Sequence, residues 1–168
     1  MELNAGIPIH SIDTEVLLRI GVAALLGPLL GLDREMRGHA AGLRTHGLIC
    51  VSAAAMTVSV IALYLQFGQG GESRMDPLRI FEATGGFVGI IGAGLIVFSR
   101  GRLHNLTTAA HLWLTAVIGI ACGAGQWPLV AICGLVSVVM LTLLHFVEGD
   151  WSRDRKIGGH EDRRERSE

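Results

Sequence analysis

The stretch from residue 47 to residue 67 constrains the fold most, because it carries no charged side chain. A helix rises 1.5 Å per residue, so about 20 apolar residues cross the roughly 30 Å hydrocarbon layer of a membrane. Half of the chain is hydrophobic and 17% is charged, which is too apolar for an ordinary soluble domain. The chain is therefore predicted to be an integral membrane protein.

Long apolar runs predict an all-α fold, a polytopic membrane helix bundle with five transmembrane helices. The predicted spans lie near residues 15–32, 47–67, 78–98, 108–124 and 128–147. The fourth is short and glycine-rich, so four spans are the alternative. An outer segment, 1–14, precedes the transmembrane domain, 15–147. The charged tail, 148–168, is expected to be cytoplasmic and disordered.

Arginine and lysine residues predict the orientation. Eleven of them fall in the segments 33–46 and 99–107 and in the tail, and two, Arg74 and Arg79, fall on the other side. By the positive-inside rule the N-terminus lies outside and the C-terminus in the cytoplasm.

Glycines spaced four apart predict close helix packing in three spans. The pairs are Gly27 with Gly31, Gly85 with Gly89, and Gly119 with Gly123. On the third helix, Glu82, the glycines and Ala93 share one stripe, and Phe87, Val88, Ile91 and Leu95 lie on the other side. We expect the small stripe to face protein and the bulky side to face lipid. Cys50, Cys122 and Cys133 are expected to be small core residues.

Local signals predict where two of the helices begin. Asp76 and Pro77 place an N-cap acceptor before a proline suited to the first helical position. Asn105 or Thr107 can cap the fourth helix in the same way.

Charged and polar side chains inside the spans each need a partner or a role. Arg19 follows Glu15 by four residues and lies near the outer end, so it can pair and snorkel. Glu82 should point into the bundle, either as a structural ion pair with Arg79 or as a functional carboxylate. His111 could relay protons, bind a metal, or form an interior hydrogen bond.

A dense polar block, Asp33 to His46, separates the first two spans and is expected to be a short loop folded against the membrane. Asp33 and Arg37 can pair at i,i+4. The block can serve as a topology-setting loop near anionic lipid, or it can carry function. The sequence holds no Walker, HExxH, GxSxG or CxxC motif, so neither an enzyme nor a cofactor is expected.

Three ordered motifs resemble the MgtC/SapB family of bacterial inner-membrane proteins. The first is Gly31-Leu32-Asp33-Arg34-Glu35 with Ala41-Gly42-Leu43-Arg44-Thr45-His46. The second is Asp76-Pro77-Leu78-Arg79-Ile80 with Gly89-Ile90-Ile91-Gly92-Ala93-Gly94. The third runs from Leu106 to Ala116. The resemblance covers about residues 15 to 147.

The resemblance implies a multi-pass protein of the inner (plasma) membrane that supports magnesium or acid-stress homeostasis by binding or regulating other membrane machinery. The alternative is a transporter or channel for Mg²⁺ or protons that uses Glu82 and the Asp33 to His46 block. The expected partners are the lipid bilayer, a membrane protein and further copies joined through GxxxG faces; nucleic acid is not expected. The candidate functional polar residues are Asp33, Arg34, Glu35, Arg44, Thr45, His46, Asp76, Arg79, Glu82, Thr107, Thr108 and His111.

Overall fold

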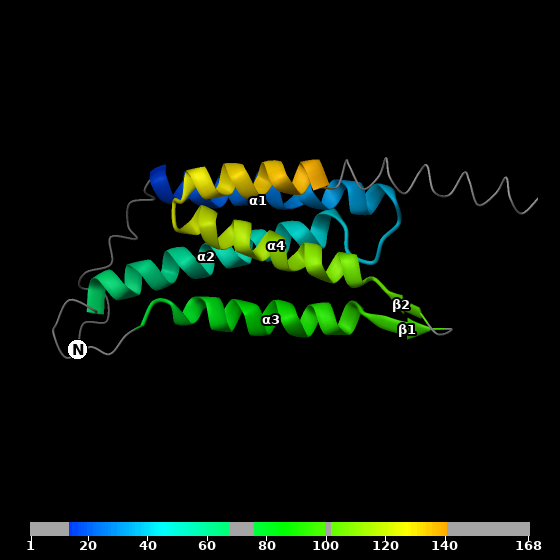
Figure 1. The fold of residues 1–168 in the computed structure, drawn as a ribbon. Coiled ribbons are helices and arrows are strands. Elements are labelled where there is room, and N and C mark those ends of the chain that lie inside the picture. The colour runs from blue at the N-terminus through cyan, green and yellow to red at the C-terminus, as the bar shows by residue number, and fades with distance from the viewer. Residues whose placement is uncertain (1–13, 68–75, 100–101, 141–168) are drawn as a thin grey trace, which may run out of the picture. The chain divides into compact units, whose positions relative to one another are not determined.

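The computed structural model describes residues 14–67, 76–99 and 102–140. Its helices are α1 (Thr14–Met36), α2 (Leu43–Phe67), α3 (Arg79–Leu95), α4 (Leu106–Gly123) and a further apolar helix, Trp127–Met140. Two antiparallel strands, β1 (Val97–Ser99) and β2 (Arg102–His104), connect α3 to α4 (Figure 1). The chain divides into two compact units, residues 1–134 and 135–168, and only the helical residues 135–140 of the second are described.

The all-α prediction is confirmed apart from this short hairpin. Among the described residues, α1, α2 and α4 are long and apolar enough to cross a membrane. The predicted fourth span, described as short and glycine-rich, corresponds to α4, whose 18 residues make it a candidate span by length and composition. The shorter helices are α3, with 17 residues, and Trp127–Met140. Five helices are thus confirmed, whereas five complete spans and their orientation stay predictions. The predicted disorder of the tail lies outside the described residues.

The block between the first two spans is mostly helical, so the predicted loop at residues 33–46 was wrong. α1 continues to Met36, α2 begins at Leu43, and only residues 37–42 connect them. Charged side chains mark where hydropathy falls, but arginine, glutamate and methionine are good helix formers and do not end a helix. The membrane boundary and the helix boundary therefore differ here.

Two side-chain contacts hold this helical connection. Arg37 Nε donates a hydrogen bond to Asp33 Oδ1 at 2.8 Å, which confirms the predicted i,i+4 pair. The backbone N–H of Leu43 donates to Glu35 Oε2 at 3.1 Å. Because the first N–H groups of a helix lack intrahelical partners, the Glu35 carboxylate caps the start of α2.

Two of the three glycine pairs hold helices in close contact, as predicted. A Cβ atom at Gly27 would lie 2.8 Å from Gly47 Cα, and one at Gly31 would lie 2.7 Å from the carbonyl oxygen of Gly42 just before α2, so α1 approaches α2 at its backbone. A Cβ at Gly123 would lie 2.5 Å from the Ala54 carbonyl oxygen on α2. Real Cβ atoms are essentially never closer than 3.0 Å to such neighbours. Residues of α1, α2 and α4 form the main core, which includes the buried Ala23, Leu30, Cys50, Ala54, Ile118, Ala121 and Cys122.

The third glycine pair does not pack as predicted. A Cβ at Gly85 would meet Trp113 of α4 at 3.2 Å, but Gly89 faces open space, and Glu82 is exposed. The buried face of α3 comprises Ile80, Thr84, Val88 and Gly92. Val88 packs into a cluster with Leu112 of α4, so a large apolar side chain fills this interface. The predicted inner stripe is therefore on the open side of α3, and Val88 is inside.

The starts of α3 and α4 differ in how well they match their predicted caps. Asp76 Oδ1 accepts a hydrogen bond from the N–H of Leu78 at 2.9 Å, although the helix proper begins at Arg79. Asn105 precedes α4 in the left-handed conformation, with φ of 63°, and its side chain makes no cap bond. Its amide Nδ2 instead donates to the Leu95 carbonyl at 3.1 Å, which joins the end of α3 to the start of α4. The predicted Asn105 cap was wrong for this reason.

Candidate functional site

Nine of the twelve candidate residues lie at one end of the helices, where α1 ends and α2 and α4 begin. We call this set the α1–α2–α4 polar end: Asp33, Arg34, Glu35, Arg44, Thr45, His46, Thr107, Thr108 and His111. Segments that are 60 residues or more apart in the chain meet here, since His46 and His111 are 65 residues apart. The other three candidates lie at or just before the start of α3, at the opposite end, because the β1–β2 hairpin makes α3 and α4 antiparallel.

Two buried histidines join α2 to α4 at the polar end. The ring of His46 is fully buried and that of His111 is 8% exposed. His46 Nε2 lies 3.0 Å from His111 Nδ1, and His46 Nδ1 lies 2.9 Å from the Gly42 carbonyl oxygen. The prediction of a hydrogen-bonded interior histidine at position 111 is confirmed, and its partner is a second histidine.

The direction of these bonds follows from the carbonyl. A carbonyl oxygen only accepts, so His46 Nδ1 carries a hydrogen and donates to Gly42. If both rings are neutral, His46 Nε2 must accept from the N–H at His111 Nδ1. His111 Nε2 is then left with a lone pair, and it is buried without a hydrogen-bond partner in the described structure. In the histidine pair, His46 Nδ1 is therefore bonded to a backbone carbonyl, whereas His111 Nε2 can still accept a hydrogen bond from a donor.

A second open polar atom lies one turn before His111. Thr108 Oγ1 is also buried without a partner among the described residues. Elsewhere in the spans, Thr57 and Thr115 donate to the carbonyls of Ala53 and His111 at 2.8 and 2.9 Å, the usual bond within one's own helix. Two buried polar atoms without partners, i and i+3 on one helix, could together hold one small molecule with a donor and an acceptor.

Charged residues surround this pair on the α1 side. Arg34 Nη1 donates to Thr107 Oγ1 at 3.4 Å, which links the end of α1 to the start of α4. Arg44 is exposed, and Thr45 is half-buried. The polar end thus has a buried imidazole pair inside and a guanidinium on its surface.

The described residues contain no group of three His, Cys, Asp or Glu side chains placed to hold a metal ion. The two histidines could supply two ligands, whereas a structural zinc site takes four. For His111, the structure therefore favours the predicted interior hydrogen bond over the predicted role as a metal ligand.

The opposite end holds Asp76, Arg79 and Glu82, and the structure does not unite them into a network. All three are exposed, and within the described residues Arg79 and Glu82 form no ion pair. The expectation that Glu82 points into the bundle was wrong, because Thr84 and Val88, on the other side of α3, face its neighbours.

Sequence reasoning missed one contact at this opposite end. Arg19 pairs with Glu15 as predicted, but its Nη1 also donates to the Gly123 carbonyl of α4 at 2.9 Å. A guanidinium at a helix C-terminus satisfies free carbonyls and complements the helix dipole. The signal was a lone arginine in an apolar helix, but no spacing rule identifies a partner 104 residues away.

Comparisons with known proteins agree over most of the chain. The model of the MgtC family matches residues 20–149. SapB of Bacillus subtilis is 39% identical over 115 residues, which cover 68% of this chain and 50% of that protein. The "Putative magnesium transporter YhiD" of Escherichia coli is 38% identical over 134 residues, covering 78% of this chain and 61% of that protein. MgtC of Brucella abortus is 34% identical over 122 residues, covering 73% and 48%.

The matched part spans about half to three fifths of the length of these curated relatives. No solved structure matches the chain.

Proposed function

The chain belongs to the MgtC family, and from this premise we propose that it supports magnesium and acid-stress homeostasis by binding or regulating other membrane machinery. The contact surface in this proposal is the α1–α2–α4 polar end. Arg34 and Arg44 of this end, with the neighbouring Arg37, favour a cytoplasmic location for it by the positive-inside rule. The relative named for magnesium transport supports the link to that ion and nothing finer.

The observation that carries the proposal is the contrast between an accessible polar end and a tightly packed interior. Gly119 packs against the carbonyl of Cys50 and Gly27 against the backbone of Gly47, so α2 is in backbone contact with both α4 and α1. The buried hydroxyls of Thr57 and Thr115, deeper in α2 and α4, are bonded within their own helices. A cation crossing this core would find few free ligands, whereas a route for ions needs polar groups along its length.

Arg44 is the residue on which the proposal is tested. It is exposed and has no hydrogen bond to the rest of the described chain, so replacing it should leave the fold intact. Arginine presents a planar fork that binds a carboxylate or phosphate with two bonds, and lysine does not. Arg44→Lys keeps the charge that sets topology but removes this fork.

Growth of cells that depend on this protein in low magnesium is the readout. We expect Arg44→Lys to reduce growth at unchanged membrane abundance. The matched control is Arg37→Lys in the connection just before α2, where the arginine bonds Asp33 at the end of α1. Equal growth of Arg44→Lys and wild type would contradict a role for this surface.

Transport by the chain itself is the alternative, and it needs a separate measurement. Purified full-length protein in liposomes should give no Mg²⁺ or proton flux above that of empty liposomes. A flux that Glu82→Gln abolishes would replace regulation by transport, with an assembly of copies supplying the wall that a single copy does not provide.

A further inference from the structure

Two cavities lie end to end along the seam between α2 and α3. The first, of about 500 Å³, is lined by residues from Met56 to Tyr64 on α2 and from Asp76 to Ala83 at the start of α3. The second, of about 310 Å³, is lined by residues from Leu48 to Met56 on α2 and from Thr84 to Ile91 on α3. Met56 lines both, so the two cavities adjoin along the seam, and we call them together the α2–α3 groove.

The walls of this groove are apolar over most of its length. Val60 and Leu63 line the first cavity, and Ile49, Phe87 and Ile91 line the second. From Leu48 to Tyr64 the groove follows α2 for about 24 Å at 1.5 Å per residue. α2 contacts α3 far less than it contacts α1 or α4, which leaves the groove open. Its length and walls suit an extended hydrocarbon chain.

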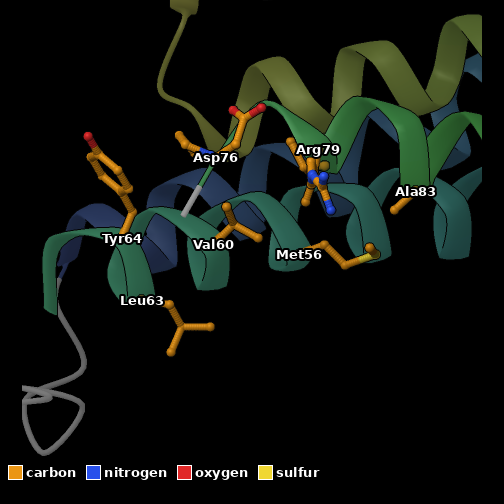
Figure 2. A pocket seen from close by; sticks show the side chains of 9 residues that line it. Met56, Val60, Leu63, Tyr64, Asp76, Arg79 and Ala83 are labelled. Carbon is orange, nitrogen blue, oxygen red and sulfur yellow. The ribbon is translucent and has the colours of Figure 1, made fainter. Parts of the chain in front are cut away.

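Polar groups of both signs stand at one end only. Figure 2 shows Tyr64, Asp76 and Arg79 around the first cavity. The Asp76 carboxylate bonds the N–H of Leu78 through Oδ1, and its second oxygen has no bond within the described residues. Arg79 is exposed and forms no hydrogen bond or ion pair there. Tyrosine favours the level of the lipid headgroups, so we expect this end of the groove at a membrane surface.

We propose that the α2–α3 groove binds a phospholipid whose headgroup carries both a phosphate and an ammonium group. The guanidinium of Arg79 binds the phosphate, the carboxylate of Asp76 binds the ammonium, and an acyl chain lies along the apolar walls. One positive and one negative charge at the mouth match a zwitterionic headgroup better than a purely anionic one. The site is at the opposite end from the surface of the proposed function and does not depend on it.

Lipid retention by the full-length protein tests this assignment. The purified protein in mild detergent is incubated with phosphatidylethanolamine and phosphatidylglycerol of identical acyl chains, and native mass spectrometry counts the lipids retained. We expect phosphatidylethanolamine to be retained in preference. Asp76→Asn should abolish this preference, because the remaining partner, Arg79, binds the phosphate that both lipids carry.

Arg79→Gln should lower retention of both lipids by about threefold, or about 0.7 kcal/mol, as suits an exposed charge pair. The matched control is Arg37→Gln, which removes an arginine that does not line the groove. Equal retention of the two lipids by the wild type, or no change in preference in Asp76→Asn, would overturn the headgroup assignment.

A second pair of variants tests the acyl chain. Ala83 lines the first cavity, so Ala83→Phe should fill it and displace the lipid. Ala93 is an exposed residue of the same helix that lines neither cavity, so Ala93→Phe should retain lipid like the wild type. Lipid retention unaffected by Ala83→Phe overturns the proposal. If the wild type is a dimer and Ala83→Phe dissociates it, the proposal is also overturned, because a helix of a second copy would then occupy the groove.

Discussion

The interface between α2 and α4 and the seam between α2 and α3 join helices of similar apolar composition, but they pack differently. Gly119 and Gly123 bring α4 into contact with the backbone of α2, and little space remains. Along the α2–α3 seam the helices stay apart and enclose the groove, and Gly89, four residues after Gly85 on α3, faces open space. The same residue type at the same spacing therefore seals one interface and leaves the other helix free for lipid or another partner. Glycine permits close approach, but the neighbouring helix decides whether it occurs.

The largest effect is expected where a side chain would enter the sealed interface. A Cβ at Gly119 would overlap the Cys50 carbonyl oxygen and lie 2.9 Å from Ala53 Cβ, so Gly119→Val should lower the free energy of unfolding by about 3 kcal/mol. Thermal unfolding in detergent measures this loss. Gly89→Val adds the same atoms on the open face of α3 and should stay within about 0.5 kcal/mol of wild type. Similar losses in both variants would remove the distinction.

The histidine pair should give the next largest effect. His111→Leu leaves His46 Nε2 buried without its partner, and such a group costs about 1 to 3 kcal/mol. Replacing both histidines by leucine should cost less than the sum of the two single changes. The measurement is a double-mutant cycle on the free energy of unfolding, and additive single effects would mean that the rings do not interact.

The third prediction compares the loss of stability when a hydrogen-bonded glutamate and a glutamate without a hydrogen bond are each replaced by alanine. Glu35 accepts the N–H of Leu43 at the start of α2, so Glu35→Ala should cost about 1 kcal/mol. Glu82 is exposed on α3 and has no hydrogen bond in the described structure, so Glu82→Ala should change stability by less than about 0.5 kcal/mol. A larger cost at Glu82 in the membrane than in detergent would indicate that another chain covers it there.

The smallest effect concerns two buried threonines. Thr57 donates to the Ala53 carbonyl, so Thr57→Val should lower stability by about 0.5 to 1 kcal/mol. Thr84 Oγ1 is buried on the α2–α3 seam without a partner, so Thr84→Val should be neutral or slightly stabilising. The free energies of unfolding of the two variants are measured in the same detergent. A greater loss of stability in Thr84→Val than in Thr57→Val would show that the Thr84 hydroxyl has a hydrogen-bond partner in solution.

Local rules in the sequence predicted much of the candidate site. The Asp33–Arg37 and Glu15–Arg19 pairs depend on a spacing of four residues within one helix, and both are present. The motifs that resemble the MgtC/SapB family also selected His46 and His111 as candidates. The hydrogen bond between the two rings was not predicted, since no spacing rule relates residues on α2 and α4.

Amphipathic reasoning failed on α3 for a related reason. The pattern separates a small stripe from a bulky one, and both can face protein or lipid, because lipid is as apolar as a leucine side chain. Packing against Leu112 buried Val88 and left Glu82 exposed. In a soluble protein a glutamate is expected on the outer, water-facing side of a helix. In a membrane the outer side of a helix faces lipid, so this rule does not apply.

The sequence by itself determined that the chain enters a membrane, that it forms five helices, and which polar residues are candidates for function. These properties depend on hydropathy and on contacts within a turn or two of helix, and the chain carries that information locally. Only the tertiary structure decided which glycines touch a backbone, that His46 meets His111, and that the α2–α3 seam remains a groove. Those outcomes depend on how helices lie against one another, and lipid supplies no hydrophobic force between them that a sequence pattern could reveal.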